Sequence, residues 1–275
     1  MDKMSRVLLT SKGEKLSQYL HKVFQYRSLA FSLARRDLKV QYAQTFLGLL
    51  WSVIQPLTSL LVWTFFFTKL ITNVDTGSIP YPLFAFSGMI SWYYFTNIFS
   101  NAGTSLVNSQ DLIRKIYFPR IILPLSKTLV GFAEFFISLS LLFIMMLFMG
   151  KTPSWQIVFL PFFIILNIIT GLAFGLWLSA LTIRYRDFQH IIPFFIYMGI
   201  WLTPVFYPTT LIPSEYNFLI YINPIAAVIA GYRWSLFGGE MLSPYYLVSF
   251  GIMTVTLISG FIFFRRNEYV IADYI

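Results

Sequence analysis

The chain has 275 residues, of which 57% are hydrophobic, 20% aromatic and only 11% charged, and its mean hydropathy is +0.69. A soluble domain usually carries about 25% charged residues, so this composition excludes an ordinary soluble enzyme and indicates an integral membrane protein. Cysteine is absent, and the two histidines, His21 and His190, lie far apart in the chain. These counts exclude a disulfide framework and a thiolate site, and we expect no bound metal.

Six apolar segments are long enough to cross a bilayer, whose hydrocarbon core of roughly 30 Å needs about 20 helical residues. They are 46–71, 82–107, 121–149, 155–181, the shorter 191–207, and 245–264. A strand barrel would show alternating segments of about ten residues, and the sequence has none. We therefore predict an all-α integral membrane protein with six transmembrane helices.

The positive charges predict the orientation. Of the 20 Lys and Arg residues, 17 fall before the first span, near the second connection, after the fourth span or after the sixth, and only Lys69, Lys151 and Arg233 fall on the other side. Since cytoplasmic loops carry the excess of Lys and Arg, both termini are predicted to be cytoplasmic. Topology thus explains the net charge of +9, and no nucleic-acid partner is expected. The first forty-odd residues lack the apolar stretch of a cleavable signal peptide.

The predicted spans divide the chain into three parts. Residues 1–45 form a cytoplasmic extension, 46–264 a transmembrane domain and 265–275 a cytoplasmic tail. Residues 28–45 have the pattern of an amphipathic helix lying on the membrane surface. Its expected apolar side carries Phe31, Ala34, Leu38 and Tyr42, and its polar side Ser32, Arg36 and Lys39. The alternative is a helical extension of the first span.

The cytoplasmic connection 108–119 is polar and charged, yet it carries Leu112, Ile113 and Ile116 at near-helical spacing. Pro119 is expected to stop this helix before the third span. A short helix with apolar side chains at the cytosol indicates a partner surface. A solvated loop is the alternative.

The external stretch 207–244 is interrupted by four prolines and by Gly238-Gly239. Its apolar runs, 218–222 and 225–229, are both too short to span. Two short re-entrant or interfacial helices fit best, and they form a candidate gate at the outer mouth.

Glu134 lies near the middle of the third span. An ionisable group there is costly, roughly 2.5–3.5 kcal/mol on insertion scales, so it must face protein or water. Two interpretations stay open: a protonated side chain packed between helices, or a direct role in transport.

Two helical stripes combine polar and aromatic side chains. The first span carries Trp51, Gln55, Thr58 and Phe66, and the fifth carries Phe194, Tyr197 and Trp201. Sugars stack on aromatic rings and hydrogen-bond to amides and hydroxyls, so these stripes are candidate channel linings; core packing is the alternative. In the fourth span, Gly171, Gly175 and Ser179 form a small-residue run that predicts close helix packing.

Two patterns resemble a nucleotide-binding motif and a catalytic cluster, but each lacks residues that such a site requires. Gly150-Lys151-Thr152 resembles the end of a phosphate loop, but Met145 stands where that loop needs a glycine, so no ATPase site of the chain's own is recognisable. Arg186-Asp187 with His190 is the nearest approach to a catalytic cluster, and it lacks a nucleophile and a second carboxylate. We expect a transport subunit and not an enzyme.

Several motifs in order resemble a known family. The motifs before and within the first span are Arg36-Asp37-Leu38-Lys39-Val40-Gln41-Tyr42, Thr45-Phe46-Leu47-Gly48, Trp51 and Gln55-Pro56. The connection before the third span and the start of that span carry Leu112 to Arg120 and Leu123-Pro124-Leu125. The later motifs are Arg184-Tyr185-Arg186-Asp187, Pro204-Val205-Phe206-Tyr207, Asn223-Pro224, Phe264, Glu268 and Ala272-Asp273. Together they resemble the permease subunit of type-2 ABC exporters, in the branch that exports lipid-linked polysaccharides such as O-antigen, capsule and teichoic acid. Gln41 departs from the basic residue usual there.

This resemblance implies a homodimer in the cytoplasmic (inner) membrane, in contact with membrane lipids, driven by two copies of a cytosolic ABC ATPase that holds ATP and Mg. It implies an undecaprenyl diphosphate-linked polysaccharide as substrate, moved through a channel between the two copies, for lipopolysaccharide biosynthesis or a related pathway. A drug or small-lipid permease of the same superfamily, or a membrane-embedded glycan-modifying enzyme, are the alternatives.

The resemblance also implies roles for residues. The ATPase-coupling residues would be Asp111, Leu112, Ile113, Arg114, Lys115, Tyr117, Arg36, Asp37, Arg186 and Asp187. The external gate would comprise Tyr207, Tyr216, Tyr221, Asn223, Pro224 and Arg233.

Overall fold

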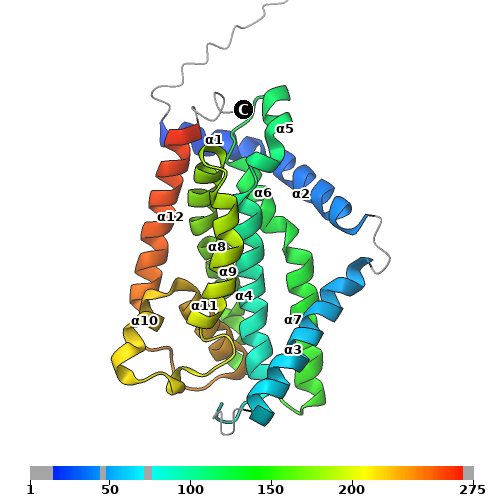
Figure 1. Ribbon diagram of the computed structural model, residues 1–275, viewed down its shortest axis with the longest axis vertical. Coiled ribbons are helices and arrows are strands. Elements are labelled where there is room, and N and C mark those ends of the chain that lie inside the picture. The colour runs from blue at the N-terminus through cyan, green and yellow to red at the C-terminus, as the bar shows by residue number, and fades with distance from the viewer. Residues whose placement is uncertain (1–14, 44–47, 71–75, 269–275) are drawn as a thin grey trace, which may run out of the picture.

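The computed structural model describes residues 15–43, 48–70 and 76–268, and within these ranges the chain is helical with no strand (Figure 1). The predicted start of the first span at 46–47, its end at residue 71 and the tail beyond Glu268, including Ala272-Asp273, lie outside the described residues. The predicted all-α class is confirmed.

Each of the six predicted spans is mainly helical, but residues 104–106 of the second and 203–207 of the fifth lie outside the helices. The first is α3 (Trp51–Phe65) with a π-helical turn (Phe66–Leu70); the second α4 (Tyr81–Gly103); the third α6 (Ile122–Val130) and α7 (Phe132–Phe148); the fourth a 3-10 turn (Trp155–Phe159) and α8 (Leu160–Arg184); the fifth α9 (Phe188–Leu202); the sixth α12 (Tyr246–Glu268). Successive segments run up and down the long axis (Figure 1).

Within the described residues, four stretches are long and apolar enough to cross a membrane, so the chain is an integral membrane protein. They are Trp51–Thr68, Ile122–Phe148, Trp155–Arg184 and Tyr246–Glu268. Helix α4 has 23 residues but a more polar composition, and α9 has only 15 residues. The number of six spans therefore stays a prediction.

Helix α4 is the centre of the bundle, and α8 packs closely against it. A Cβ atom added to Gly171 would lie 2.8 Å from Cβ of Ile98, and one added to Gly175 would lie 2.8 Å from Cβ of Ala102. One turn further, the hydroxyls of Ser105 and Ser179 are 3.2 Å apart. The small-residue run thus lets two backbones approach, as predicted for the fourth span.

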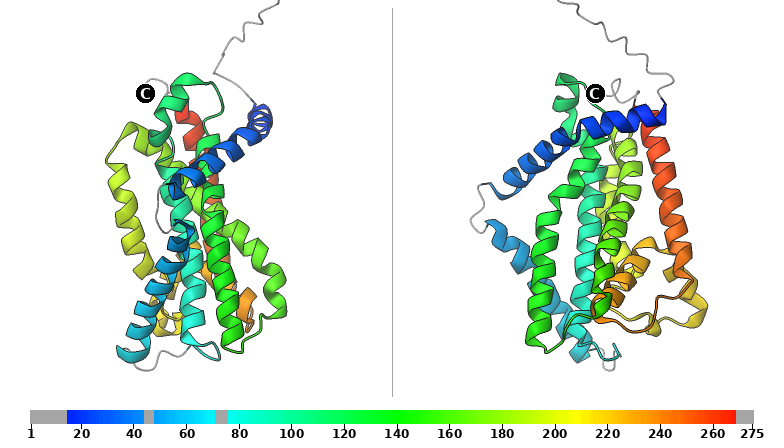
Figure 2. Two further views of the ribbon diagram at one scale, coloured as in Figure 1. Left: turned by 90° about the vertical axis from the view of Figure 1, so that its right-hand side faces the viewer. Right: turned by 180° about the vertical axis from the view of Figure 1, so that it is seen from behind.

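Two helices at the amino-terminal side lie across one end of the bundle: α1 (Leu16–Gln25) and α2 (Arg27–Tyr42), both seen in the right-hand view of Figure 2. The predicted surface helix is α2, and its Ala34, Leu38 and Tyr42 are buried or half-buried. Phe31, on the same predicted side, is 62% exposed, whereas Leu33 is buried, and the placement of α2 on the membrane surface stays a prediction. Helix α1 was not predicted.

The two ends of the bundle differ. A short helix, α5 (Gln110–Lys115), follows a 3-10 turn (Val107–Ser109) and protrudes at the end of the bundle that carries α1, while α10 (Asn217–Ile222) and α11 (Pro224–Phe237) lie at the opposite end (Figure 1). Two further 3-10 turns, Thr209–Leu211 and Ser214–Tyr216, precede α10. The two short helices of the 207–244 stretch exist, and α11 is buried against α4 and α8; their re-entrant placement stays a prediction.

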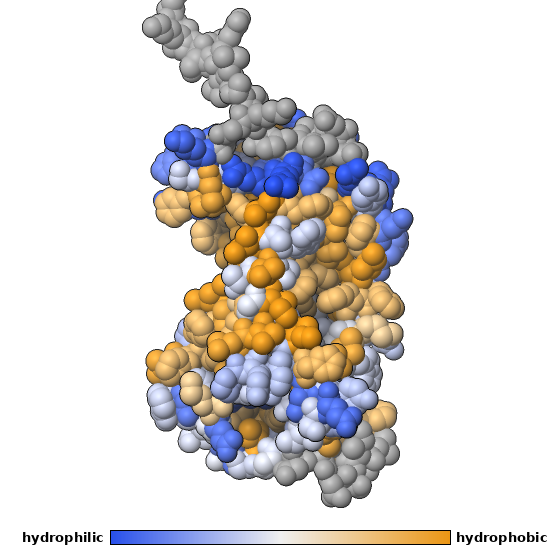
Figure 3. All heavy atoms as spheres, turned by 90° about the vertical axis from the view of Figure 1, so that its left-hand side faces the viewer, coloured by the Kyte–Doolittle hydropathy of each residue, from blue (hydrophilic) through white to orange (hydrophobic). Residues whose placement is uncertain are grey.

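The surface divides along the long axis. Figure 3 shows an apolar band around the middle of one face, between two hydrophilic ends. Helices α1, α2 and α5 and the last turn of α12, which carry described basic residues, lie at one end of the bundle (Figure 1).

Candidate functional site

Helix α5 forms a small protrusion with exposed charged and apolar side chains. Asp111, Arg114, Lys115, Ile116 and Tyr117 are all exposed, Tyr117 at 69%. Leu112 and Ile113 are half-buried and pack on an interior cluster. The predicted apolar side chains are therefore divided: Leu112 and Ile113 fix the helix to the bundle, whereas Ile116 and Tyr117 face outward.

The segment after α5 holds this protrusion in place. The helix ends at Lys115, four residues before Pro119, and residues 116–119 are not helical. Phe118 and Pro119 are buried, and Phe118 joins the same interior cluster as Leu112 and Ile113. Both flanks of the α5 tip are thus packed into the bundle.

A buried carboxylate ties three separate segments together at this end. Glu268 of α12 accepts hydrogen bonds from the Tyr19 hydroxyl of α1 (2.7 Å) and from the Arg120 backbone amide (2.6 Å). The Arg120 guanidinium also donates to the backbone carbonyl of Glu268. The sequence analysis noted Glu268 only within the resemblance; a single acid beside Arg265 and Arg266 at the end of a span was the available signal.

A second tether joins α2 to the spans. Asp37 lies 2.5 Å from Lys127 of α6 and 2.8 Å from Arg36. Burial acts to raise the pKa of Asp37, but the hydrogen bonds and charges of Lys127 and Arg36 outweigh it, and the pKa lies below the ordinary value of 3.8. Asp37 is thus engaged within the chain, while Arg36 remains 53% exposed.

The loop between α8 and α9 lies at the same end of the bundle as α5 (Figure 2). Arg186 and Asp187 are exposed, as is His190. The His190 backbone amide donates to the Asp187 carbonyl (3.0 Å) in the first turn of α9, so these residues begin a helix.

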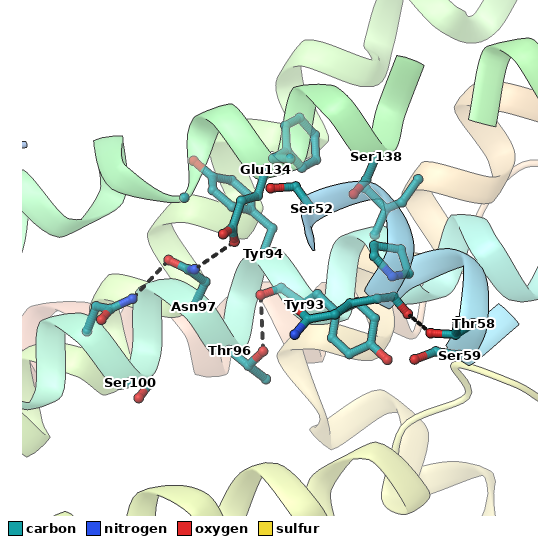
Figure 4. A pocket seen from close by; sticks show the side chains of 16 residues that line it. Ser52, Thr58, Ser59, Tyr93, Tyr94, Thr96, Asn97, Ser100, Glu134 and Ser138 are labelled. Atoms are coloured by element: carbon teal, nitrogen blue, oxygen red, sulfur yellow. Dashed lines mark hydrogen bonds between the residues drawn. The ribbon is translucent and has the colours of Figure 1, made fainter. Parts of the chain in front are cut away.

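A polar cavity of about 620 Å³ lies between α3, α4 and α7 (Figure 4). Glu134 lines it, and its carboxylate accepts hydrogen bonds from Gln41 (2.7 Å), Tyr42 (3.0 Å) and Asn97 (3.3 Å). The interior face of the third span thus meets both a polar cavity and the end of α2. All three partners donate, so both carboxyl oxygens of Glu134 act as acceptors.

Tyr42 and Ser52 connect this cavity to a smaller one of about 290 Å³, which shares Ser52, Gln55 and Glu134 with it. The hydroxyls of Tyr42 and Ser52 are 3.2 Å apart. Burial first, and then the charge of Glu134, raise the pKa of Tyr42 above its ordinary value of 10, against the opposing effect of the Ser52 hydrogen bond. The phenol therefore stays protonated and donates.

The structure divides the candidate channel linings into two groups. Gln55 and Thr58 of α3 line the larger cavity, and Trp51 and Gln55 line the smaller one. The remaining four are exposed on the outside of the chain: Phe66, Phe194, Tyr197 and Trp201. The polar cavity itself was missed by sequence reasoning, because its Asn and Ser side chains come from three different helices, α3, α4 and α7.

The aromatic faces of α3 and α9 meet at the end away from α5. The Trp63 ring lies 5.3 Å from that of Trp201 and stacks on Phe206 at 3.9 Å. The Tyr207 hydroxyl donates to the Trp201 carbonyl (2.8 Å). Aromatic contacts thus join α3 to the end of α9 and to the loop that follows it.

The predicted gate residues build the hairpin in different ways. Asn223 caps α11, whose Pro224 begins the helix, by accepting from the Ile225 amide (3.1 Å), and donates to Thr203 (2.9 Å). Tyr221 packs on Tyr245 and Tyr246, and Tyr216 is exposed.

Arg233 secures the loop before this hairpin. Its guanidinium donates to the carbonyls of Pro204 (2.8 Å), Val205 (2.6 Å) and Phe84 (3.3 Å), and it lies 3.5 Å above the Phe84 ring. Arg233 therefore clamps the segment 204–205 to α4.

A membrane-embedded helical bundle with an exposed tip at its basic end and a polar cavity among its spans has the features of a transport permease. A sequence model of the ABC-2 type transporter family matches residues 28–237, so the chain belongs to the ABC-2 type transporter family. It is a transporter permease component, and not an enzyme.

Three relatives are named for polysaccharide export. The chain is 28% identical over 254 residues to the O-antigen export system permease protein RfbA of Myxococcus xanthus, covering 90% of this chain and 96% of that one. It is 26% identical to the RfbA of Klebsiella pneumoniae (88% and 92%) and 22% identical to the polysialic acid transport protein KpsM of Escherichia coli (86% and 92%). The chain is thus homologous to O-antigen and polysaccharide export permeases.

Proposed function

We propose that this chain is the membrane subunit of an ATP-driven exporter that moves a lipid-linked polysaccharide, of the O-antigen type, across the cytoplasmic membrane. The observation that carries the proposal is the polar cavity among the spans of a permease whose relatives at 26–28% identity are named for O-antigen export. Both termini would face the cytoplasm, and the lipid carrier would be undecaprenyl diphosphate.

Energy would come from a separate subunit. The exposed α5 tip is the part of the chain best suited to enter a cytosolic ATPase, because it presents charged and apolar side chains on a helix fixed at both flanks. ATP and Mg would be held by that partner. Closure of the two ATPase subunits would push α5. Through Arg120 and Glu268, this movement would shift α1 and α12 between two conformations.

Two copies of the chain would form the channel. The described helices pack tightly around α4, and a glycan needs more space than one copy encloses. The exposed aromatic residues of α3 and α9 would then line or seal the contact between copies, since a two-fold pair buries the same face on both subunits.

The test begins with purification of the tagged chain from native membranes in mild detergent. We expect a cytosolic ATPase in equal amounts, and a mass that corresponds to two copies of each chain. A chain that purifies alone, even after crosslinking, would overturn the proposal.

A pair of substitutions tests whether α5 couples the ATPase activity of the partner to export. Asp111→Ala with Arg114→Ala is expected to reduce surface glycan at least tenfold while the complex stays assembled. The matched control is Lys151→Ala with Glu240→Ala, which removes one base and one acid away from the α5 end. Unchanged export by a stably assembled Asp111→Ala/Arg114→Ala complex would contradict the role of α5.

A further inference from the structure

The polar cavity between α3, α4 and α7 has a composition that is unusual for membrane helices. Its volume of about 620 Å³ lies within the range of small-molecule sites, about 300–1,000 Å³. Of its 16 lining residues, 12 are polar: four serines, two threonines, two asparagines, two tyrosines, Gln55 and Glu134. Polar groups inside a membrane protein are costly, and they usually mark the path of a polar substrate.

The lining suits hydroxyl groups. Serine and threonine hydroxyls and the Asn and Gln amides both donate and accept hydrogen bonds, as sugar hydroxyls do. In Figure 4 the side chains of Asn97 and Glu134 point toward one another across the space between α4 and α7, and the Asn101 amide extends this chain to Asn97 (3.1 Å). The ring of Tyr93, 38% exposed, offers an aromatic face at the same cavity.

The charge of the lining is one-sided. Glu134 is the one ionisable charge among the described residues that line the cavity, and neither lysine nor arginine is among them. The smaller adjoining cavity repeats this composition, with Glu134 beside Gln41, Tyr42, Ser52 and Gln55. A carboxylate can accept strong hydrogen bonds from sugar hydroxyls, but it repels an anionic group, which would find no cation here to pair with.

We infer that this cavity is a binding site for uncharged, hydroxyl-rich sugar residues, and that Glu134 excludes glycans that carry carboxylate or phosphate groups. The inference rests on the proposed export function and adds the charge class of the glycan. The diphosphate of the carrier lipid would consequently bind elsewhere, and the cavity would hold the sugar chain.

The test uses the full chain, with its ATPase, in nanodiscs of neutral lipid, and two probes of four sugar units. Maltotetraose is uncharged, and tetragalacturonate carries one carboxylate per unit. Saturation-transfer-difference NMR measures contact of each probe with the protein in the millimolar range. We expect the wild type to give a signal for maltotetraose at least tenfold above that for tetragalacturonate.

Three variants test whether the probes contact the protein in this cavity. Glu134→Gln is expected to narrow the difference between the probes to less than threefold, because it removes the charge and keeps the side-chain size. Ser138→Leu places a larger side chain in the cavity and is expected to reduce the maltotetraose signal at least fivefold. Ser140→Leu, an exposed position two residues further along α7, is the matched control and should stay within twofold.

Ser138→Leu keeps the inference testable if Glu134→Gln fails to fold. Equal signals for both probes in the wild type, or a maltotetraose signal that survives Ser138→Leu, would overturn the inference while leaving the export function intact, provided that the ATPase still copurifies. Absence of the ATPase together with unaltered surface glycan in a deletion strain would overturn both.

Discussion

The ion pair between Asp37 and Lys127 is expected to stabilise the docking of α2 on α6. The nitrogen and oxygen atoms are 2.5 Å apart, and the two side chains are 17% and 15% exposed. At an effective dielectric constant of about 20, the gross attraction at this distance is about 7 kcal/mol. Desolvation of both charges offsets most of it, so we expect a coupling energy of about 1–3 kcal/mol.

A double-mutant cycle measures this coupling. Asp37→Asn leaves Lys127 without its carboxylate and should be the more damaging change, whereas Lys127→Met leaves Asp37 with Arg36. The double variant should lose less stability than the sum of the two. The free energy of unfolding can be measured by titrating mixed micelles with SDS and following tryptophan fluorescence.

The pH dependence provides a second check. Because the pKa of Asp37 is lowered in the folded chain, its contribution is complete above the ordinary value of 3.8 and is lost as the pH falls through the lower folded value. The stability difference between the wild type and Asp37→Asn should therefore be constant at neutral pH and shrink below about pH 4.

Two results would refute this reasoning. The first is additivity of the two substitutions to within about 0.5 kcal/mol. The second is an Asp37→Asn variant of unchanged stability that no longer copurifies the ATPase, which would assign Asp37 to the partner contact that the resemblance implied.

Three further predictions concern packing and capping. Gly171→Ala should destabilise the chain by about 1–3 kcal/mol, because the added Cβ would meet Ile98. Gly251→Ala has open space around it and should be neutral or stabilising by up to about 1 kcal/mol. Equal effects of the two substitutions in the SDS titration would contradict close α4–α8 packing. Tyr19→Phe should remove about 1 kcal/mol from the docking of α1, seen as faster tryptic cleavage within residues 15–27, and an unchanged rate would contradict the Glu268 tether. Asn223→Ala should destabilise α11 by about 1 kcal/mol, and an Ala variant as stable as the wild type would refute the capping role.

The helical segments could be read from the sequence because membrane helices satisfy their own backbone hydrogen bonds, and length and hydropathy therefore mark them directly. The small-residue run of α8 likewise predicted a close approach that Ile98 and Ala102 of α4 complete. Helix α1 has only 10 residues and was not predicted, and packing on the bundle, not the helical pattern, decided that Leu33 of α2 is buried and Phe31 exposed.

Glu134 shows where sequence reasoning stopped. Its position within an apolar span predicted that it must face protein or water, and left packing and transport as alternatives. Only the packed structure brings Gln41 and Tyr42, more than 90 positions earlier in the chain, and Asn97 onto its carboxylate. Hydropathy along one helix carries no information about which polar side chains of other helices share its cavity.

The sequence by itself determined the class of this protein: an apolar, cysteine-free chain with basic segments on alternate connections has to be a helical membrane protein, and its ordered motifs indicated a polysaccharide permease. The tertiary structure decided which residues act together. It engaged Asp37 with Lys127 and Glu268 with Arg120, and it gathered polar residues of α3, α4 and α7 around one cavity. The reason is physical: hydropathy is a property of one segment, whereas a site is made by side chains that long-range packing brings within hydrogen-bonding distance.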